Sequence, residues 1–358
     1  MSEKNLAYKK ILILRLSAIG DTIHTLPLAY AIKKACPACE IGWIVEDKAQ
    51  LFINGNPLVD KCYVLPKKLW KKRGFSFENI KEFFKIINDI NQEGYELVLD
   101  TQQLFKTAMI LPLLKIKRKI ALTGGREFSP LFVNERVKAS HKLFDPDYHV
   151  VKRTLELADY LGIDSSDVKM VLKKPDDSIV NKVSELLSDI DKSKPVVVIA
   201  PATTWENKHW AEKNWIETIF EIKNKVNIVV TGTDSDMPLI KRLLDESDCH
   251  NAVVLAGKTN LEELAEVFRQ SDIVVSPDSG SAHIAWAVSK PEVITIFTST
   301  AEKRSGPFGE KCHILAPVLD CHPCLKKKCS RKDNKDLCRE FVKSSELINM
   351  IKKLLHLE

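Results

Sequence analysis

Residues 11–21 read ILILRLSAIGD, and this stretch decides the fold class. Its first four residues are all aliphatic, which is typical of a strand buried on both faces of a parallel sheet. A short polar turn at residues 17–21 follows, and residues 22–35 then place apolar side chains at helical spacing. A strand, a turn and a helix in this order begin a βαβ unit, so the stretch predicts an open parallel α/β sheet.

The same order of elements recurs along the whole chain. In the first half, the further strand-like runs are residues 41–45, 62–65, 97–99 and 118–122. After a polar stretch at residues 173–178, the pattern restarts at VVVIA, residues 196–200. The strand-like runs that follow it are residues 227–231, 252–255, 272–276 and 292–297.

We therefore predict an α/β protein with two Rossmann-like, doubly wound domains that face a cleft. The first domain should cover residues 1–172 and the second residues 173–343. The terminal helix, residues 344–358, is expected to pack back on the first domain because its apolar stripe needs a partner. Ligands of such sheets bind beyond the carboxyl ends of the strands, so the site residues should follow strands.

Composition narrows the function classes. The chain has 358 residues, of which 44% are hydrophobic, and this suits two packed cores and excludes a mainly disordered protein. The net charge of +6 indicates an anionic partner. We expect no transmembrane helix, and we interpret the short apolar run near the start as a strand rather than a signal peptide. These features predict a cytoplasmic protein whose nine cysteines stay reduced.

The first candidate group follows the first strand and consists of Ser17, Gly20 and Asp21. Gly20 would let the backbone turn tightly, and the next helix would offer free N–H groups to an anion. The Asp21 carboxylate could take a proton from an attacking hydroxyl. The alternative is that Asp21 only caps the helix that begins at Thr22.

A second group follows the strand of residues 196–200, in PATTWENKHW. The hydroxyls of Thr203 and Thr204 and the ammonium of Lys208 could bind phosphate oxygens, although a solvated loop with a salt bridge has the same composition. Asp236 follows a later strand. It could accept hydrogen bonds from a ribose, or it could simply open a helix.

The third group lies in SPDSGSAHIAWA, residues 276–287, where a strand end, a turn of small residues and a helix start succeed one another. Ser279 and Gly280 would let a phosphate approach the positive end of the helix dipole. Asp278 and His283 belong to the same turn. Their alternative roles are a helix cap and an ordinary helix histidine.

Basic residues are concentrated in PKKLWKKRG, where Lys67, Lys68 and Lys71 surround Trp70, and Arg126 lies in the Gly-rich loop TGGREFSP. Such a cluster could hold an anionic acceptor or an anionic membrane surface. The alternative for each lysine is a solvated face.

Four cysteines lie close together in CHPCLKKKCSRKDNKDLC, namely Cys321, Cys324, Cys329 and Cys338. Because the group opens with C-x-x-C, it is similar to a small metal knuckle and predicts a structural zinc or iron ion without a catalytic role. Free thiols and a redox-dependent disulfide are the alternatives.

Taken together, the strand-end motifs resemble glycosyltransferase family 9, the ADP-heptose lipopolysaccharide heptosyltransferases. LILRLSAIGDTIHTLPL looks like the family's opening strand, loop and helix, APATTWENKHWAEKNW like its phosphate loop, and VSPDSGSAHIAWAV like its diphosphate-binding turn. WIVED, KKLWKK and LVLDTQQLFKTAMI follow in the order found in the heptosyltransferase I group. The resemblance runs from about residue 10 to the last helix.

This resemblance implies a GT-B fold and an inverting transfer of heptose from ADP-L-glycero-D-manno-heptose to Kdo-lipid A, with no cofactor or metal required for catalysis. It implies an acceptor-binding first domain, a nucleotide-sugar-binding second domain and a peripheral position on the inner face of the inner membrane. Asp21 matches the catalytic base, and Asp236 stands where the family has an acidic ribose ligand, normally Glu. The donor-phosphate contacts are matched by Thr203, Thr204, Lys208, Asp278, Ser279, Gly280 and His283. The residues that match the basic contacts to the Kdo carboxylates are Lys67, Lys68, Lys71 and Arg126.

Other functions fit the sequence less well. A polyanion-binding module would explain the basic excess, but no DNA- or RNA-binding signature is present, so we expect no nucleic-acid partner. A dinucleotide-dependent dehydrogenase or epimerase would need G-x-G-x-x-G after the first strand, and SAIGD lacks it. Within the family, the acceptor could instead be an inner-core heptose or a protein hydroxyl.

Overall fold

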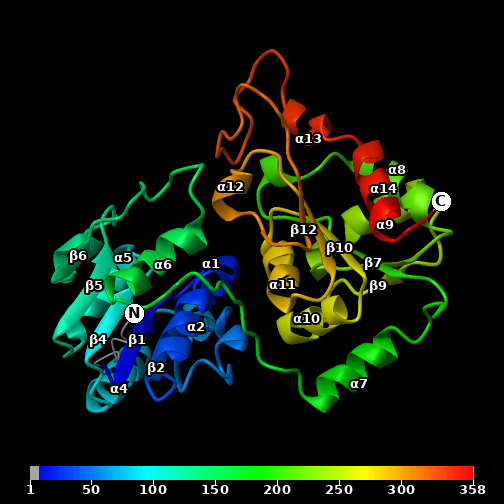
Figure 1. Cartoon of the computed structure of the whole chain (residues 1–358). Helices are drawn as coiled ribbons and strands as arrows, with labels where there is room; N and C mark the ends of the chain where they lie inside the picture. Colours follow the sequence, from blue (N-terminus) through cyan, green and yellow to red (C-terminus); the bar gives the residue numbers. More distant parts are fainter. Residues whose placement is uncertain (1–7, 358) are drawn as a thin grey trace. The chain divides into compact units, whose positions relative to one another are not determined.

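The computed structural model describes residues 8–357, and its chain divides into two compact units, Met1–Lys173 and Lys174–Glu358. Each unit is built around its own parallel sheet (Figure 1). Among residues 8–357, no helix is both long and apolar enough to cross a bilayer.

The first unit contains a six-stranded sheet with strand order β3-β2-β1-β4-β5-β6, and every pairing in it is parallel. Its strands are β1 Lys10–Leu14, β2 Glu40–Glu46, β3 Lys61–Leu65, β4 Leu97–Asp100, β5 Arg118–Leu122 and β6 Glu135–Val137. Its helices are α1 Ile19–Ile23, α2 Leu26–Ala35, α3 Lys67–Arg73, α4 Phe77–Gln92, α5 Phe105–Ile110 and α6 Val150–Tyr160. The side chains from Ile11 to Leu14 are fully buried, as the aliphatic run predicts.

Two predicted helices are divided in the structure. The helix expected over residues 22–35 is broken between α1 and α2 at His24 and Thr25, and Pro27 lies in the first turn of α2. The sequence of residues 104–114 likewise predicts one helix after the fourth strand, but α5 ends at Ile110 and the chain continues as a 3-10 turn, η2 Leu111–Leu113, which contains a proline. Proline lacks the N–H that an α-helix interior uses, so both breaks have a local cause.

The second unit repeats the topology of the first, with strand order β12-β11-β10-β7-β8-β9 and parallel pairing throughout. Its strands are β7 Val196–Ile199, β8 Asn227–Val230, β9 Val253–Val254, β10 Ile273–Pro277, β11 Glu292–Ile296 and β12 Cys312–Leu315. Its helices are α7 Asp177–Leu186, α8 Glu212–Ile222, α9 Met237–Glu246, α10 Leu261–Arg269, α11 Gly280–Val288, α12 Glu302–Ser305, α13 Leu337–Phe341 and α14 Ser344–Leu354.

The terminal helix α14 packs within the second unit, not on the first domain as we expected. Leu347 and Ile351 are completely buried in the same hydrophobic cluster as Ile219 of α8, and the two helices are in direct contact. The apolar stripe of α14 is real, but α8 covers it.

Each sheet has one topological switch point, where the chain turns from building one half of the sheet to building the other. It lies between β1 and β4 in the first unit and between β7 and β10 in the second. Because ligands of doubly wound sheets bind beyond the strands at such a point, the loops after these four strands are where functional side chains are expected.

Candidate functional site

An ion pair lies at the switch point of the second unit. Lys208, in the loop after β7, places Nζ 2.7 Å from Oδ2 of Asp278, which follows β10. The same ammonium lies 3.3 Å from the Asp278 carbonyl oxygen and 5.0 Å from the centre of the Trp205 ring. The two loops are therefore tied together at the edge where a ligand is expected.

Asp278 is held as a carboxylate although it is 4% exposed. Burial by itself raises its pKa, but the hydrogen bond from His283 and the charge of Lys208 lower the pKa below the ordinary value of an aspartate. Thr300 adds a hydroxyl donor 2.7 Å from Oδ2. Asp278 thus organises the turn and does not simply cap a helix.

The N-terminus of α11 follows directly. Ser279 is the N-cap residue. Its hydroxyl accepts a hydrogen bond from the Ser281 N–H at 3.2 Å and lies 2.8 Å from the Ser276 hydroxyl. A Cβ placed on Gly280, the first helical residue, would meet no atom within 4 Å. The first turn of α11 therefore offers backbone N–H groups next to open space, as an oxyanion requires.

The loop after β7 positions the other predicted phosphate contacts. Thr203 is half-buried and Thr204 is exposed. The Nε2 atom of His209 lies 2.9 Å from the Thr203 carbonyl oxygen, and burial lowers the pKa of His209. The loop is thus fixed from within, while the Thr204 side chain faces solvent.

Asp236 acts as a helix-opening acid, the second of the two roles weighed for it. Its Oδ2 accepts from both the backbone N–H and the hydroxyl of Thr233, each at 2.7 Å, at the start of the 3-10 turn that precedes α9. A contact from Asp236 to a ribose stays a prediction.

Asp21 combines two local interactions at the switch point of the first unit. Its Oδ2 accepts from the Ala18 N–H at 3.2 Å, within the first turn of α1, and lies 2.8 Å from the Arg15 guanidinium. The Asp21 side chain is nevertheless 45% exposed, so the carboxylate is reachable. Asp21 is therefore not the N-cap of a helix that begins at Thr22, because α1 begins at Ile19 and has Ala18 as its N-cap. The Asp21 carboxylate instead closes the first turn of α1 from within, which leaves room for a chemical role.

The interpretation of Gly20 as a tight-turn residue is wrong. Helix α1 begins at Ile19, so Gly20 is already helical, and it is not among the glycines with positive φ. The turn is instead held by Gln102 after β4, whose Oε1 accepts from the N–H of Leu16 at 2.7 Å and of Ser17 at 3.4 Å.

Two residues that shape this edge, Arg15 and Asp100, were not predicted from the sequence. The Arg15 guanidinium contacts both the Asp21 carboxylate and the Thr101 carbonyl oxygen. Arg15 is the only charged residue in the run of residues 11–16, and this could have marked it as a functional residue. Asp100 is fully buried and accepts from the backbone N–H groups of Gln102 and Gln103; burial raises its pKa. Its role is to fold the loop after β4.

Lys106 was also missed, and it lies among the predicted acceptor-binding cations. Its Nζ is 2.7 Å from Oε1 of Glu46, and Lys67 is 3.4 Å from the same oxygen. The neighbouring Lys106 lowers the pKa of Lys67. Lys71 is exposed on α3, and the backbone N–H of Lys68 donates to Asp47 at 2.6 Å while its side chain is exposed.

Arg126 lies in the loop after β5. Its guanidinium is 5.1 Å from the centre of the Phe144 ring, a cation–π geometry, and its backbone N–H donates to the Gln103 carbonyl at 3.1 Å. The loops after β4 and β5 are therefore joined through Gln103.

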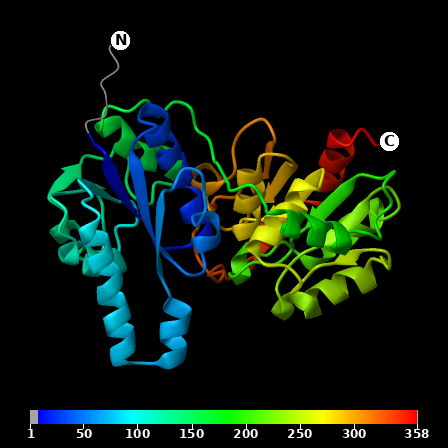
Figure 2. The ribbon, with the colours of Figure 1, turned by 90° about the horizontal axis from the view of Figure 1, so that it is seen from below.

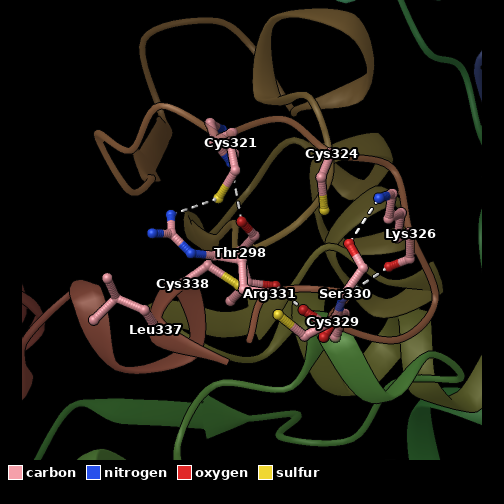
Figure 3. Close-up of a pocket in the computed structure, with 11 residues that line it drawn as sticks. Thr298, Cys321, Cys324, Lys326, Cys329, Ser330, Arg331, Leu337 and Cys338 are labelled. Carbon is pink, nitrogen blue, oxygen red and sulfur yellow. Dashed lines mark hydrogen bonds between the residues drawn. The ribbon is translucent and has the colours of Figure 1, made fainter. Parts of the chain in front are cut away.

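The four clustered cysteines line one small cavity of about 70 Å³ (Figure 3). The Arg331 guanidinium lies 3.6 Å from the sulfur of Cys321, and burial together with the neighbouring thiols raises the pKa of Cys338 to about 11. All four are free thiols. Within residues 8–357, no three His, Cys, Asp or Glu side chains lie at metal-binding spacing, so the donor type suits a thiophilic metal but the arrangement does not.

Comparisons with known proteins agree with this geometry. A model of glycosyltransferase family 9 (heptosyltransferase) matches residues 83–335, more than half of the chain. The lipopolysaccharide heptosyltransferase 1 of Salmonella typhimurium is 29% identical over 307 residues, 84% of this chain and 92% of the relative. A glycosyltransferase family 9 structure from Veillonella parvula superposes with a TM-score of 0.81 at 17% identity over 99% of both chains. The structure of the E. coli heptosyltransferase WaaC with ADP superposes with a TM-score of 0.74 at 24% identity, over 96% of this chain and 99% of that chain. The similarity to these two structures shows that the chain has the GT-B fold.

Proposed function

Because the chain belongs to glycosyltransferase family 9, we propose that it is the lipopolysaccharide core heptosyltransferase that transfers heptose from ADP-L-glycero-D-manno-heptose to Kdo of Kdo-lipid A. The chain is a glycosyltransferase of the heptosyltransferase family. The donor, the Kdo acceptor and the inverting course are the parts that need testing. The single observation that carries the proposal is the ion-paired turn beyond β7 and β10, next to the open first turn of α11.

The donor diphosphate is proposed to lie at the N-terminus of α11, near Ser279 and Gly280. A lysine ammonium has three N–H donors, and two of those of Lys208 reach Asp278, which leaves one for a phosphate oxygen. The positive charge of Lys208 and the helix dipole would stabilise the negative charge that grows on ADP as it leaves. Such fixed charges supply the stabilisation without a catalytic metal.

Asp21 is proposed as the general base. A Kdo hydroxyl would lose its proton to the Asp21 carboxylate as its oxygen attacks the anomeric carbon, and the bond from that carbon to the ADP oxygen would break with inversion. The Arg15 guanidinium beside Asp21 holds the carboxylate in place. Lys67, Lys68, Lys71 and Arg126 are the proposed contacts to the acceptor carboxylates, with Ser17 and Gly20 retained as donor contacts.

The protein is proposed to lie in the cytoplasm, peripheral to an anionic inner membrane that contains the lipid acceptor. The basic residues of α3 support this position, since each lysine or arginine near an anionic surface adds about 1 kcal/mol of attraction.

The test is a transfer assay with purified protein, ADP-heptose and Kdo-lipid A, with the mass of the lipid followed over time. We expect the lipid to gain one heptose. Asp21→Asn should bind ADP as the unchanged protein does but turn over about 100-fold more slowly, the usual effect of losing a general base. Transfer only to an inner-core heptose or to a protein hydroxyl would reassign the acceptor, and unchanged turnover in Asp21→Asn would reduce Asp21 to a cap.

A structural zinc or iron ion at Cys321, Cys324, Cys329 and Cys338 stays a prediction outside the reaction. Four thiols around one cavity support it, whereas their spacing does not. Metal analysis of the purified protein decides it, because a resident ion would be present at about one equivalent and lost from a Cys324→Ser variant.

A further inference from the structure

Helices α3 and α4 form a hairpin that projects from the first unit; α4 is the long cyan helix in Figure 2. The hairpin is held by specific contacts. The Trp70 indole N–H donates to Glu82 at 2.8 Å, its ring meets Phe83 edge-on, and the Asn79 side chain donates to the Gly74 carbonyl at 2.8 Å. The tip between the helices is therefore a built structure.

The tip exposes aromatic side chains. Phe75 is 98% exposed and Phe77 is 80% exposed. Phe77, Ile80 and Phe84 are spaced three and four residues apart on α4, so they share one face of the helix, and all three are exposed. Burying a phenylalanine is normally favourable, so an apolar face left in water at a projecting tip indicates a surface that binds.

The same hairpin carries most of the chain's excess charge. Residues 66–85 contain seven basic and two acidic residues, whereas the whole chain has a net charge of +6. Lys71, Lys72 and Arg73 directly precede the tip, and Lys81 and Lys85 follow it on α4; all five are exposed. An apolar tip ringed by cations is complementary to a surface that is anionic outside and apolar inside.

We propose that the α3–α4 hairpin is a membrane anchor that inserts Phe75 and Phe77 into the interface of an anionic phospholipid bilayer. The occupant is a bilayer and not a protein, because two phenylalanines on a narrow tip bury far less than the roughly 800 Å² per partner of a stable protein interface. Lys72, Arg73 and Lys81, the cations nearest the tip, would lie among the headgroups.

The dimensions of the hairpin link this anchor to the proposed reaction. Helix α3 has seven residues, so it spans about 10 Å from Lys67 to the tip. The headgroup layer on each side of a bilayer is roughly 5–8 Å thick. With the phenylalanines at the acyl boundary, Lys67 would stand just outside the headgroups, where the sugar of a lipid-linked acceptor projects. This link rests on the proposed function, whereas the anchor itself does not.

Vesicle flotation tests the anchor. The full-length protein is mixed with phosphatidylcholine vesicles containing about 30% phosphatidylglycerol, and the bound fraction is compared with that on pure phosphatidylcholine. We expect binding only to the anionic vesicles, and a loss of at least about tenfold for Phe75→Ser with Phe77→Ser. The matched control is Phe220→Ser in the second unit, which removes a phenylalanine that is 54% exposed and has Lys223 beside it.

Three outcomes would overturn the anchor: unchanged binding of the double variant, an equal loss in Phe220→Ser, or equal binding to neutral vesicles. The double variant should keep the melting temperature of the unchanged protein, since both side chains are exposed. Its turnover on an acceptor without acyl chains should also be unchanged. That assay separates the two proposals, because an inactive parent protein would reject the transfer reaction and leave the flotation result standing.

Discussion

Lys208 and Asp278 form an ion pair that is largely removed from water, with side chains 18% and 6% exposed. Removing charges from water is costly, and the cost is met here by a direct contact together with hydrogen bonds from Thr300 and His283. Breaking such a pair from one side leaves the other charge buried without a partner. At the scale of the residue, this pair should therefore stabilise the second unit as well as shape the phosphate site.

Asp278→Asn should lower the free energy of unfolding of the second unit by about 2–4 kcal/mol at pH 7, because it leaves Lys208 without its counter-charge. Calorimetry measures the loss. The double variant with Lys208→Met should recover part of it, since the unpaired charge is then gone. If the double variant is no more stable than Asp278→Asn, the lost hydrogen bonds and not the unpaired charge cause the decrease in the free energy of unfolding.

The pH dependence of this loss follows from the lowered pKa of Asp278. A carboxyl whose pKa is lower in the folded than in the unfolded protein stabilises the folded state at any pH above its unfolded-state pKa, which is about 4 for an aspartate. That stabilisation is lost as the pH falls from the unfolded-state pKa through the folded-state pKa. The difference between the parent and Asp278→Asn should therefore be constant from about pH 5 to 8 and shrink below about pH 4. A difference that shrinks at neutral pH would assign the effect to another group.

At the scale of the element, the first turn of α11 can be separated into its structural and binding roles. Gly280→Ala adds a methyl group that meets nothing in the protein, and alanine favours a helix, so stability should be unchanged or rise by up to about 1 kcal/mol. The same methyl group would stand where a phosphate approaches the backbone. We expect ADP to bind about tenfold more weakly by titration calorimetry. Equal ADP affinity would move the diphosphate away from this turn.

The parallel sheets could be predicted because the central strands β1 and β7 contain uninterrupted aliphatic runs, residues 11–14 and Val196–Ile199. The edge strands β6 and β12 were not predicted. The sequence of β6, ERV, is short and polar, and that of β12, CHIL, is only four residues long and does not form part of a longer apolar run. Helix α3 escaped as well: it has no buried residue, so no apolar period marks it, and the segment was interpreted only as a basic patch.

The site shows the same division. Candidate site residues that directly follow a strand could be predicted from the sequence, because a short stretch of sequence is enough to show where a strand ends. The pairing of Lys208 with Asp278 joins positions 70 residues apart and depends on β7 lying beside β10, which no local pattern encodes. Gly20 was misassigned for a related reason, since composition alone does not show whether α1 begins before or after it.

At the scale of the whole molecule, each unit has its own hydrophobic core. Buried side chains of β1, β2 and β4 form the core of the first unit with α4, and those of β7, β8 and β10 form the core of the second with α8 and α14. A chain built from two such cores is expected to unfold in two transitions rather than one. A ligand should then stabilise only the unit that binds it.

This expectation gives a test of the donor site that needs no acceptor and no substitution. With ADP at about 100 times its dissociation constant, the unit that binds it gains about 2.7 kcal/mol, which raises the melting temperature of a unit of this size by about 5–10 °C. Differential scanning calorimetry should show that shift in the transition of the second unit and none in the first. Hydrogen exchange identifies the units, because ADP should protect the loops after β7 and β10. A shift in the first unit alone would contradict the donor site, since Lys208, Ser279 and Gly280, on which the diphosphate is proposed to lie, belong to the second unit.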